Sequence, residues 1–228
     1  MSAPPPSDRT RVHQLPDRAC YDRATIHRLL DEGLVAHVGV TLDGQPFVIP
    51  MNYARDRERL LLHGARSSRL MTALLAGSHV CLTVTHVDGL VVGRSATRHT
   101  MNYRSVMVFG QAREIADPPA KLAAVKAFVE HFLPGGWELA RPPTPAEMAA
   151  VVMVEIPLDE ASAKIRTGPP RLTPTDRETD HWSGELPLRL AMLPPVPHPA
   201  DSTAPLPPAI ADYQRSGMIR IPPGQSDV

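Results

Sequence analysis

The stretch 60–76 brings together side chains that could bind an anion. An apolar, strand-like run and a helical run are joined there by a short turn that contains Ser67, Ser68 and Arg69, with Arg66 just before them. Ser67 lies where a helix N-cap is expected, and the positive side chains on either side are unfavourable next to the positive end of the helix dipole. A bound anion reverses that balance, because arginines, serine hydroxyls and free backbone N–H groups can hold it together. The turn alone is equally compatible with a capped surface helix and two solvated arginines.

Other kinds of chemistry lack their patterns in this sequence. There are ten histidines but no H-E-x-x-H, no H-x-x-x-H and no cluster of cysteine and histidine at ligand spacing, so no metal site is expected. No serine lies in a G-x-S-x-G turn, which leaves a hydrolase triad unsupported. The G-x-G-x-x-G and Walker A patterns are also missing, so phosphate binding must use another device.

Strands supply most of the framework that must position the turn. Alternating apolar residues and β-branched runs predict six or seven antiparallel strands, at 34–42, 45–53, 59–63, 80–85, 90–97, 102–113 and 151–156. Asp43-Gly44 and Asp88-Gly89 are typical hairpin turns. Helices are predicted at 22–33, after the turn, at 118–132 and from Pro145. The fold class is therefore mainly β with peripheral helices, in a closed antiparallel barrel.

Length and charge limit the class of protein. The 228 residues carry a formal net charge of zero, which gives no electrostatic case for a nucleic acid or an anionic membrane as a partner. The N-terminus shows no apolar signal segment, and Cys20 and Cys81 are expected to be free thiols, so we expect a soluble cytoplasmic protein. The predicted divisions are a flexible lead-in at 1–18, a barrel domain at 19–193 and a Pro-rich C-terminal tail at 194–228, with a short helix or arm possible in 209–220.

Six motifs in order resemble one known family. They are Tyr21-Asp22-Arg23-Ala24-Thr25-Ile26, Asp43-Gly44-Gln45-Pro46-Phe47-Val48-Ile49-Pro50, Leu62-His63-Gly64 with Ser67-Ser68-Arg69, Asp88-Gly89-Leu90-Val91, Asn102-Tyr103-Arg104-Ser105-Val106-Met107-Val108-Phe109-Gly110 and Ala161-Ser162-Ala163-Lys164-Ile165-Arg166-Thr167-Gly168. From about residue 11 to 190, the chain resembles the pyridoxamine 5'-phosphate oxidase-like, FMN-binding split-barrel superfamily. Within it, the chain is similar to the nitroimidazole-resistance-like flavin-nucleotide-binding branch.

The resemblance implies an antiparallel split β-barrel that forms a homodimer with FMN at the subunit interface. It implies that Ser67, Ser68 and Arg69 hold the FMN phosphate, with His63 beside it at the strand end. The segment Val48, Ile49, Pro50, Met51 and Asn52 would line the isoalloxazine ring, mostly through backbone groups. The remaining expected contacts come from Arg104 and Ser105 and, from the second subunit, from Lys164, Arg166 and Trp182.

Plainer interpretations stand beside these. Asn52 and Ser105 are compatible with ordinary strand residues, and Lys164 and Arg166 with a solvated face. Trp182 is compatible with a packing anchor for the last crossing of the chain. The true pyridoxamine phosphate oxidases carry an Arg-x-His near the C-terminus that handles substrate, and residues 184–191 of this chain contain no such histidine. Vitamin B6 oxidation is therefore not expected.

Three hypotheses about function follow from the resemblance. The first is an FMN-dependent oxidoreductase acting on a small molecule, in which the flavin performs the reaction and no side chain is assigned as catalytic. The second is a non-catalytic flavin-binding protein that stores or senses flavin. The third keeps the barrel and replaces FMN with deazaflavin F420 or with haem, for which His63 or His99 would be the axial ligand.

Overall fold

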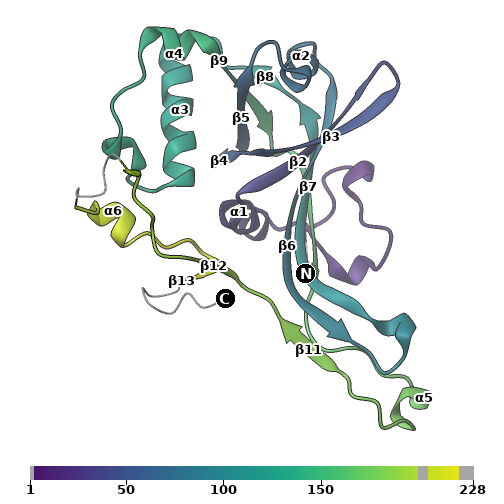
Figure 1. Ribbon diagram of the computed structural model, residues 1–228. Helices are drawn as coiled ribbons and strands as arrows, with labels where there is room; N and C mark the ends of the chain where they lie inside the picture. The colour runs from purple at the N-terminus through teal and green to yellow at the C-terminus, as the bar shows by residue number, and fades with distance from the viewer. Residues whose placement is uncertain (1–2, 200–204, 221–228) are drawn as a thin grey trace.

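Two antiparallel sheets form the body of the protein. The computed structural model describes residues 3–199 and 205–220 (Figure 1). The larger sheet has seven strands, in the spatial order β1 (Ala19–Cys20), β10 (Glu160–Arg166), β7 (Thr100–Gln111), β6 (His79–Val92), β2 (Val35–Leu42) and β3 (Gln45–Asn52), with β11 (Gly184–Pro187) also paired to β6. The smaller sheet has four strands, in the order β4 (Ala54–Asp56), β5 (Arg59–Ala65), β9 (Val151–Pro157) and β8 (Arg113–Glu114). This arrangement is the predicted split-barrel fold.

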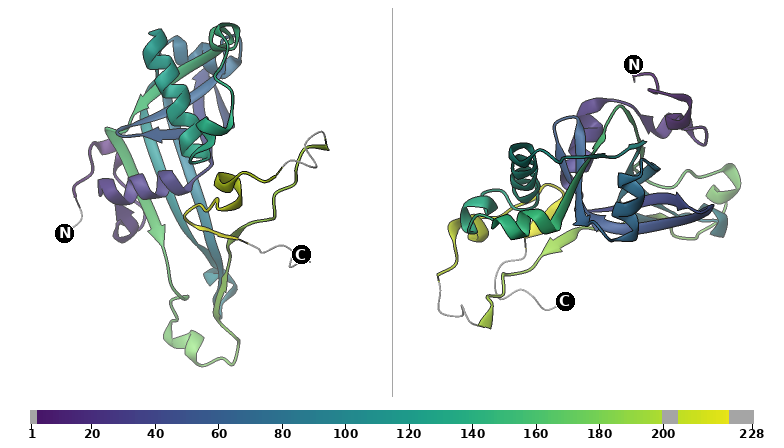
Figure 2. Two further views of the ribbon diagram at one scale, coloured as in Figure 1. Left: turned by 90° about the vertical axis from the view of Figure 1, so that its left-hand side faces the viewer. Right: turned by 90° about the horizontal axis from the view of Figure 1, so that it is seen from above.

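Helices and short turns surround the sheets. The helices are α1 (Arg23–Glu32), α2 (Arg69–Leu75), α3 (Pro118–Phe132), α4 (Pro145–Ala150), α5 (Pro174–Arg177) and α6 (Pro208–Ala211). A separate pair of parallel strands joins β12 (Leu190–Met192) to β13 (Met218–Arg220). The views from the side and from above place α3 and α4 together on one side of the barrel (Figure 2). None of the helices in the described ranges is long and apolar enough to cross a membrane.

The main core fills the space between the two sheets. Alternating residues of the larger sheet meet alternating residues of the smaller one, so that Val38, Leu82 and Val106 are buried with Leu60 and Leu62. A second, smaller cluster lies on the outer side of β5 and β9 and includes Leu61, Met153 and Phe128 of α3. The period of two along β5 thus divides its side chains between the barrel interior and α3.

Local signals in the sequence explain where the helices begin. Asp22 directly precedes α1, and its carboxylate caps the helix by accepting the backbone N–H of Thr25 at 2.9 Å. Thr144 and Glu147 form a capping box at the start of α4, where Pro145 fixes the first helical residue. The helices predicted at 22–33 and 118–132 are confirmed.

The predicted turn at Asp88-Gly89 is wrong. Strand β6 continues through it to Val92, and the pairing with β7 shifts by one residue between Val87 and Gly89, so that Asp88 is the extra residue of a β-bulge. Gly89 is required there for space, because a Cβ atom would lie 2.9 Å from the carbonyl oxygen of Leu186 on β11. The dipeptide therefore marks a bulge and a strand crossing instead of a hairpin.

Short elements occur in the described parts of both segments that are predicted to lie outside the barrel domain. Near the N-terminus, two short 3-10 turns, Asp8–Thr10 and Pro16–Arg18, pack against β10, and Thr10 is buried. In the predicted C-terminal tail, helix α6 and strand β13 return to the barrel, as the yellow segment in Figure 1 shows. The strand β10, at Glu160–Arg166, also extends the barrel past the last predicted strand.

Candidate functional site

The turn between β5 and α2 presents its polar side chains to solvent. Ser67, Ser68 and Arg69 are all exposed. The Ser68 hydroxyl accepts the backbone N–H of Met71 at 3.3 Å and so caps α2, one residue after Ser67, the cap that the sequence predicts. The guanidinium of Arg69 lies 4.5 Å from the centre of the Phe47 ring on β3. This contact joins the turn to the neighbouring strand and leaves the charge of Arg69 without an acidic partner among the described residues.

The other arginine of the turn is engaged elsewhere. Arg66 forms an ion pair with Glu114 of β8, and its backbone carbonyl oxygen accepts the Thr72 hydroxyl at 3.4 Å. Only Arg69, of the two arginines expected to hold an anion, is therefore free to do so. Arg66 is thus bound to the smaller sheet, whereas Arg69 belongs to the candidate site.

Strand β3 lies at the edge of the larger sheet beside this turn. It pairs with β2, and no other described strand pairs with it. Phe47, Ile49 and Met51 turn toward the core, whereas Val48, with 65% of its surface exposed, and Pro50 face outward. A strand with a free edge offers backbone N–H and C=O groups to a ligand, and proline is tolerated at such an edge.

His63 lies on the outer side of β5, which faces α3. Its ring meets the Phe128 ring of α3 edge-on, with the centroids 4.6 Å apart. Burial lowers the pKa of His63, which keeps the ring neutral near pH 7. No hydrogen bond joins this ring to another described residue. The expected place of His63 beside a phosphate stays a prediction.

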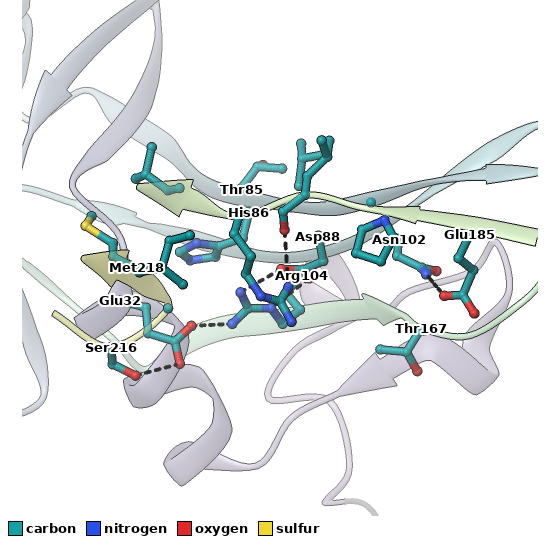
Figure 3. Close-up of a pocket in the computed structure, with 18 of the residues that line it drawn as sticks. Glu32, Thr85, His86, Asp88, Asn102, Arg104, Thr167, Glu185, Ser216 and Met218 are labelled. Carbon is teal, nitrogen blue, oxygen red and sulfur yellow. Dashed lines mark hydrogen bonds and ion pairs between the residues drawn. The ribbon is translucent and has the colours of Figure 1, made fainter. Parts of the chain in front are cut away.

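Arg104 lies in a groove at one end of the barrel (Figure 3). Its guanidinium donates two hydrogen bonds of 2.8 Å to the Asp88 carboxylate and also forms an ion pair with Glu32 of α1. These two carboxylates raise the pKa of Arg104. Burial by itself would raise the pKa of Glu32, but the guanidinium groups of Arg104 and Arg28 outweigh burial and lower that pKa. The bulge residue Asp88 thus has a role that the sequence pattern does not reveal.

The groove has a volume of about 1020 Å³. Its inner wall comes from the β6–β7 hairpin, where His86 and Arg104 are paired residues, and its outer wall from residues 187–190 and 216–219. His86 Nε2 lies 2.9 Å from the Leu29 carbonyl oxygen of α1. The charged groups of the groove are mostly paired with one another, as Arg104 is with Asp88 and Glu32.

The other predicted contact residues are distributed over the outer face and one end of the larger sheet. Ser105 and Lys164 are neighbours on paired strands, and the Ser105 hydroxyl donates to the Lys164 carbonyl oxygen at 3.4 Å. The Lys164 ammonium donates to the Gln14 carbonyl oxygen at 2.7 Å. Trp182 is 62% exposed, so it is no buried packing anchor.

Arg166 is buried, which contradicts the solvated-face interpretation for this residue. Its guanidinium bonds Asn102 and the carbonyl oxygens of Gly168, at 2.8 Å, and Pro169, at 3.2 Å. Burial lowers the pKa of Arg166. Asn102 in turn donates to the Glu185 carboxylate at 2.6 Å, so Arg166 fixes the end of the hairpin against β11.

One chain therefore brings together only part of the predicted set. The turn residues and β3 lie side by side, whereas Arg104, Arg166 and the pair Ser105–Lys164 lie elsewhere on the barrel. Within residues 3–199 and 205–220, no group of three or more potential metal-binding side chains is present. Glu32, which lines the groove, and Arg215, which donates to the Glu32 carbonyl oxygen, were not predicted, because neither lies in a recognisable motif.

Comparisons with known proteins agree with this fold. The family described as pyridoxamine 5'-phosphate oxidase matches residues 22–165. The flavocytochrome Anf3 from Azotobacter vinelandii is 38% identical and superposes with a TM-score of 0.88, covering 93% of this chain and 100% of its own. The FAD and haem binding protein from Mycobacterium smegmatis is 31% identical with a TM-score of 0.82, covering 85% of this chain and 96% of its own.

A more distant structure shares the fold alone. It is a putative 5-nitroimidazole antibiotic resistance protein from Bacteroides thetaiotaomicron, 22% identical with a TM-score of 0.55, and it covers 64% of this chain and 86% of its own. No curated protein matches the sequence.

Proposed function

Because the chain belongs to the pyridoxamine 5'-phosphate oxidase-like family of flavin-binding split barrels, we propose that it is a flavoprotein that acts as an oxidoreductase on a small molecule. The observation that carries the proposal is the turn at residues 67–69 next to the free edge of β3. Two hydroxyls, one guanidinium without an acidic partner among the described residues and a row of backbone groups suit a phosphate joined to a planar ring system. The donor set fits a flavin nucleotide.

Each part of the site has a separate task. Arg69 binds the phosphate by charge, and Ser67 and Ser68 add hydrogen bonds. The outward residues Val48 and Pro50 give the ring an apolar surface at the edge of β3. When bound, a flavin supplies hydride or electron transfer, so the chain itself needs to bind, orient and shield it.

The nucleotide form is part of the proposal. The family resemblance favours FMN, whereas the relative from Mycobacterium smegmatis is described as binding FAD. Both nucleotides contain the same ring, ribityl chain and first phosphate, and the turn at residues 67–69 would bind that shared part.

Haem is a second candidate ligand, in addition to the flavin. Anf3 is described as a flavocytochrome, and the mycobacterial relative as binding FAD and haem. Of the two histidines proposed from the sequence, His99 is exposed, whereas His63 is half-buried, with its pKa lowered by burial. A neutral imidazole without a hydrogen-bond partner among the described residues is suited to bind iron. We therefore assign His63 as the candidate axial ligand.

We also propose a homodimer. The outward face of the larger sheet carries exposed apolar side chains, which are Val48, Val87, Leu90, Met101, Met107 and Leu186. Exposed apolar side chains gathered on one face are typical of a protein interface. This face includes the outward side of β3, where the flavin is proposed to bind. A second copy placed on the face would therefore help to cover the flavin.

The visible spectrum of the purified protein, followed by mass analysis of the ligand released by heat, tests this function. We expect flavin absorbance and release of FAD or FMN; a colourless protein that takes up neither would refute the proposal. A Soret band that disappears in His63→Ala while the flavin remains would support haem binding at His63. Anaerobic mixing with NADH, NADPH or reduced ferredoxin then separates the two flavin hypotheses, because a non-catalytic binder would show no flavin reduction with any donor.

A further inference from the structure

Residues 205–220, which we call the C-terminal arm, cross the end of the barrel in an unusual way. The arm contains α6 and β13, and its only strand partner among the described residues is β12, with which it forms a parallel pair outside the two barrel sheets. Gly135, just after α3, lies close to Ala209 of α6, because a Cβ atom on Gly135 would be 3.5 Å from the Ala209 side chain. The arm thus lies against the barrel without joining either barrel sheet (Figure 2).

One buried arginine attaches the arm. Arg215 is only 9% exposed. Its guanidinium donates to the carbonyl oxygens of Gly33 at 2.7 Å, His131 at 2.6 Å and Glu32 at 3.3 Å. These carbonyls lie at the C-terminal ends of α1 and α3, where helices leave their last carbonyl groups unpaired and favour a positive charge.

The rest of the attachment is weak. Helix α6 has no buried residue, and the arm residues around Arg215 are exposed or half-buried. Two further side-chain hydrogen bonds contribute, from the Tyr213 hydroxyl to the Phe132 carbonyl oxygen at 2.9 Å and from the Ser216 hydroxyl to the Glu32 carboxylate at 3.4 Å. Little apolar surface would be exposed if the arm detached, and water could then solvate both the guanidinium and the freed carbonyls.

The arm also forms a wall of the groove. Ser216, Gly217, Met218 and Ile219 line it opposite His86 and Arg104, and Figure 3 shows Ser216 and Met218 on that side. Glu32 connects the two walls, since its carboxylate contacts both Ser216 and Arg104. Movement of the arm would therefore change the width of the groove directly.

We propose that the C-terminal arm is a strap over the groove, held closed by Arg215 and able to open while the barrel stays folded. Closed, the strap restricts the groove to the space between it and the hairpin. Open, it exposes His86, Arg104 and the end of α1 to molecules too large for the closed groove. This inference is independent of the flavin proposal, because it uses no residue of the turn at 67–69 or of β3.

Limited trypsin digestion of the full-length protein tests the strap, because Arg215 is itself a cleavage site. In the native protein we expect cleavage after the exposed Arg220 to be at least ten times faster than cleavage after Arg215. Arg215→Lys keeps both the charge and the cleavage site but loses the fork that reaches several carbonyls. We expect cleavage at position 215 of this variant to accelerate at least tenfold. Arg220→Lys is the matched control and should leave cleavage at 215 unchanged.

Hydrogen–deuterium exchange of the same variants locates the opening. Faster exchange at residues 213–220 in Arg215→Lys, with unchanged protection in β6 and β7, is the expected result. Equal protection of the arm in both proteins would show that Arg215 does not hold it. Faster exchange throughout β6 and β7 would show that Arg215 supports the whole barrel, and either of these two results would overturn the strap.

Discussion

Arg69 and Arg215 show how the surroundings of one side-chain type separate two roles. Arg69 is exposed and lies over an aromatic ring, with no acidic partner among the described residues, so its charge is available to a ligand. Arg215 is buried and its donors are used by backbone carbonyls, so its charge serves attachment. The pattern around Arg69 was readable in the sequence because two serines precede it at a helix start. Arg215 gave no such signal, because its partners are carbonyl groups from two distant helices.

We expect Arg69→Ala to weaken flavin binding. Loss of one charge-assisted contact to a phosphate should cost about 1.5–3 kcal/mol, or about a 10- to 100-fold rise in Kd. Fluorescence titration of the apoprotein with FMN and FAD measures this change. Arg66→Ala is the control, because Arg66 is paired with Glu114 and should have a smaller effect. Equal affinity in native protein and Arg69→Ala would move the phosphate site away from the turn.

His131 should make stability depend on pH. Burial, and then the charge of Arg215, lower the pKa of this histidine to about 4. The unfolded chain, in which its pKa is about 6.5, therefore binds more protons between these two values, and stability falls as the pH drops below about 6.5. Because the ring is partly exposed, we expect a loss of about 1–2 kcal/mol between pH 7 and pH 5.

Urea unfolding at pH 7, 6 and 5 measures that loss. His131→Asn removes the titrating group and should flatten the dependence in this range, although it lowers stability at pH 7. A variant with the same slope as the native protein would show that other groups cause the pH dependence.

Strand β6 illustrates what element-level patterns reveal and what they miss. The alternation of Val80, Leu82 and Val84 predicts the strand and its buried face, because one side of the sheet meets the core. The end of the strand was mispredicted, because Asp-Gly is common in hairpin turns. Here Asp88-Gly89 forms a bulge beside β11, about a hundred residues later in the chain, and a local pattern does not reveal such a contact. Helices α1 and α3 were predictable because their caps and apolar faces are local features.

Gly89→Ala should destabilise the crossing of β6 and β11. The added methyl group would lie 2.9 Å from the Leu186 carbonyl oxygen and would push β11 away. We expect a loss of about 1–3 kcal/mol in the free energy of unfolding, as for other overpacked sites. Thermal and urea unfolding measure it, with the exposed Thr85→Ala on the same strand as a control that should change stability by about 0.5 kcal/mol or less. Equal stability of both variants would mean that β11 contributes little to the fold.

At the scale of the whole molecule, the candidate site is only partly built by one chain. The turn and β3 are together, whereas the residues expected from a second subunit, Lys164, Arg166 and Trp182, lie elsewhere on the same barrel. Sequence patterns describe one chain, so they predicted the residue types but gave no way to place two copies. Arg166 in particular has its donors occupied within its own chain, which leaves it less available to a partner.

Met107→Glu should dissociate the proposed dimer. Met107 is 38% exposed on the outward face of β7, and a carboxylate there would be buried without a partner on association. We expect light scattering to give twice the 24.8 kDa chain mass for the native protein and a single chain mass for the variant. Leu122→Glu, at a similarly exposed position on α3, should remain dimeric. A native protein that is monomeric at micromolar concentration would refute the homodimer.

The parallel pairing of β12 with β13 gives the Pro-rich region between them a practical use. The pairing brings the two ends of that region side by side, and the free energy of closing a loop rises by only about 0.6 kcal/mol when its length doubles. Val196, which is 91% exposed, lies inside it. A small fluorescent reporter inserted after Val196 should therefore leave the barrel folded. The reporter would then lie in the segment that leads into the arm. The fluorescence of such a variant would then report the opening and closing of the groove.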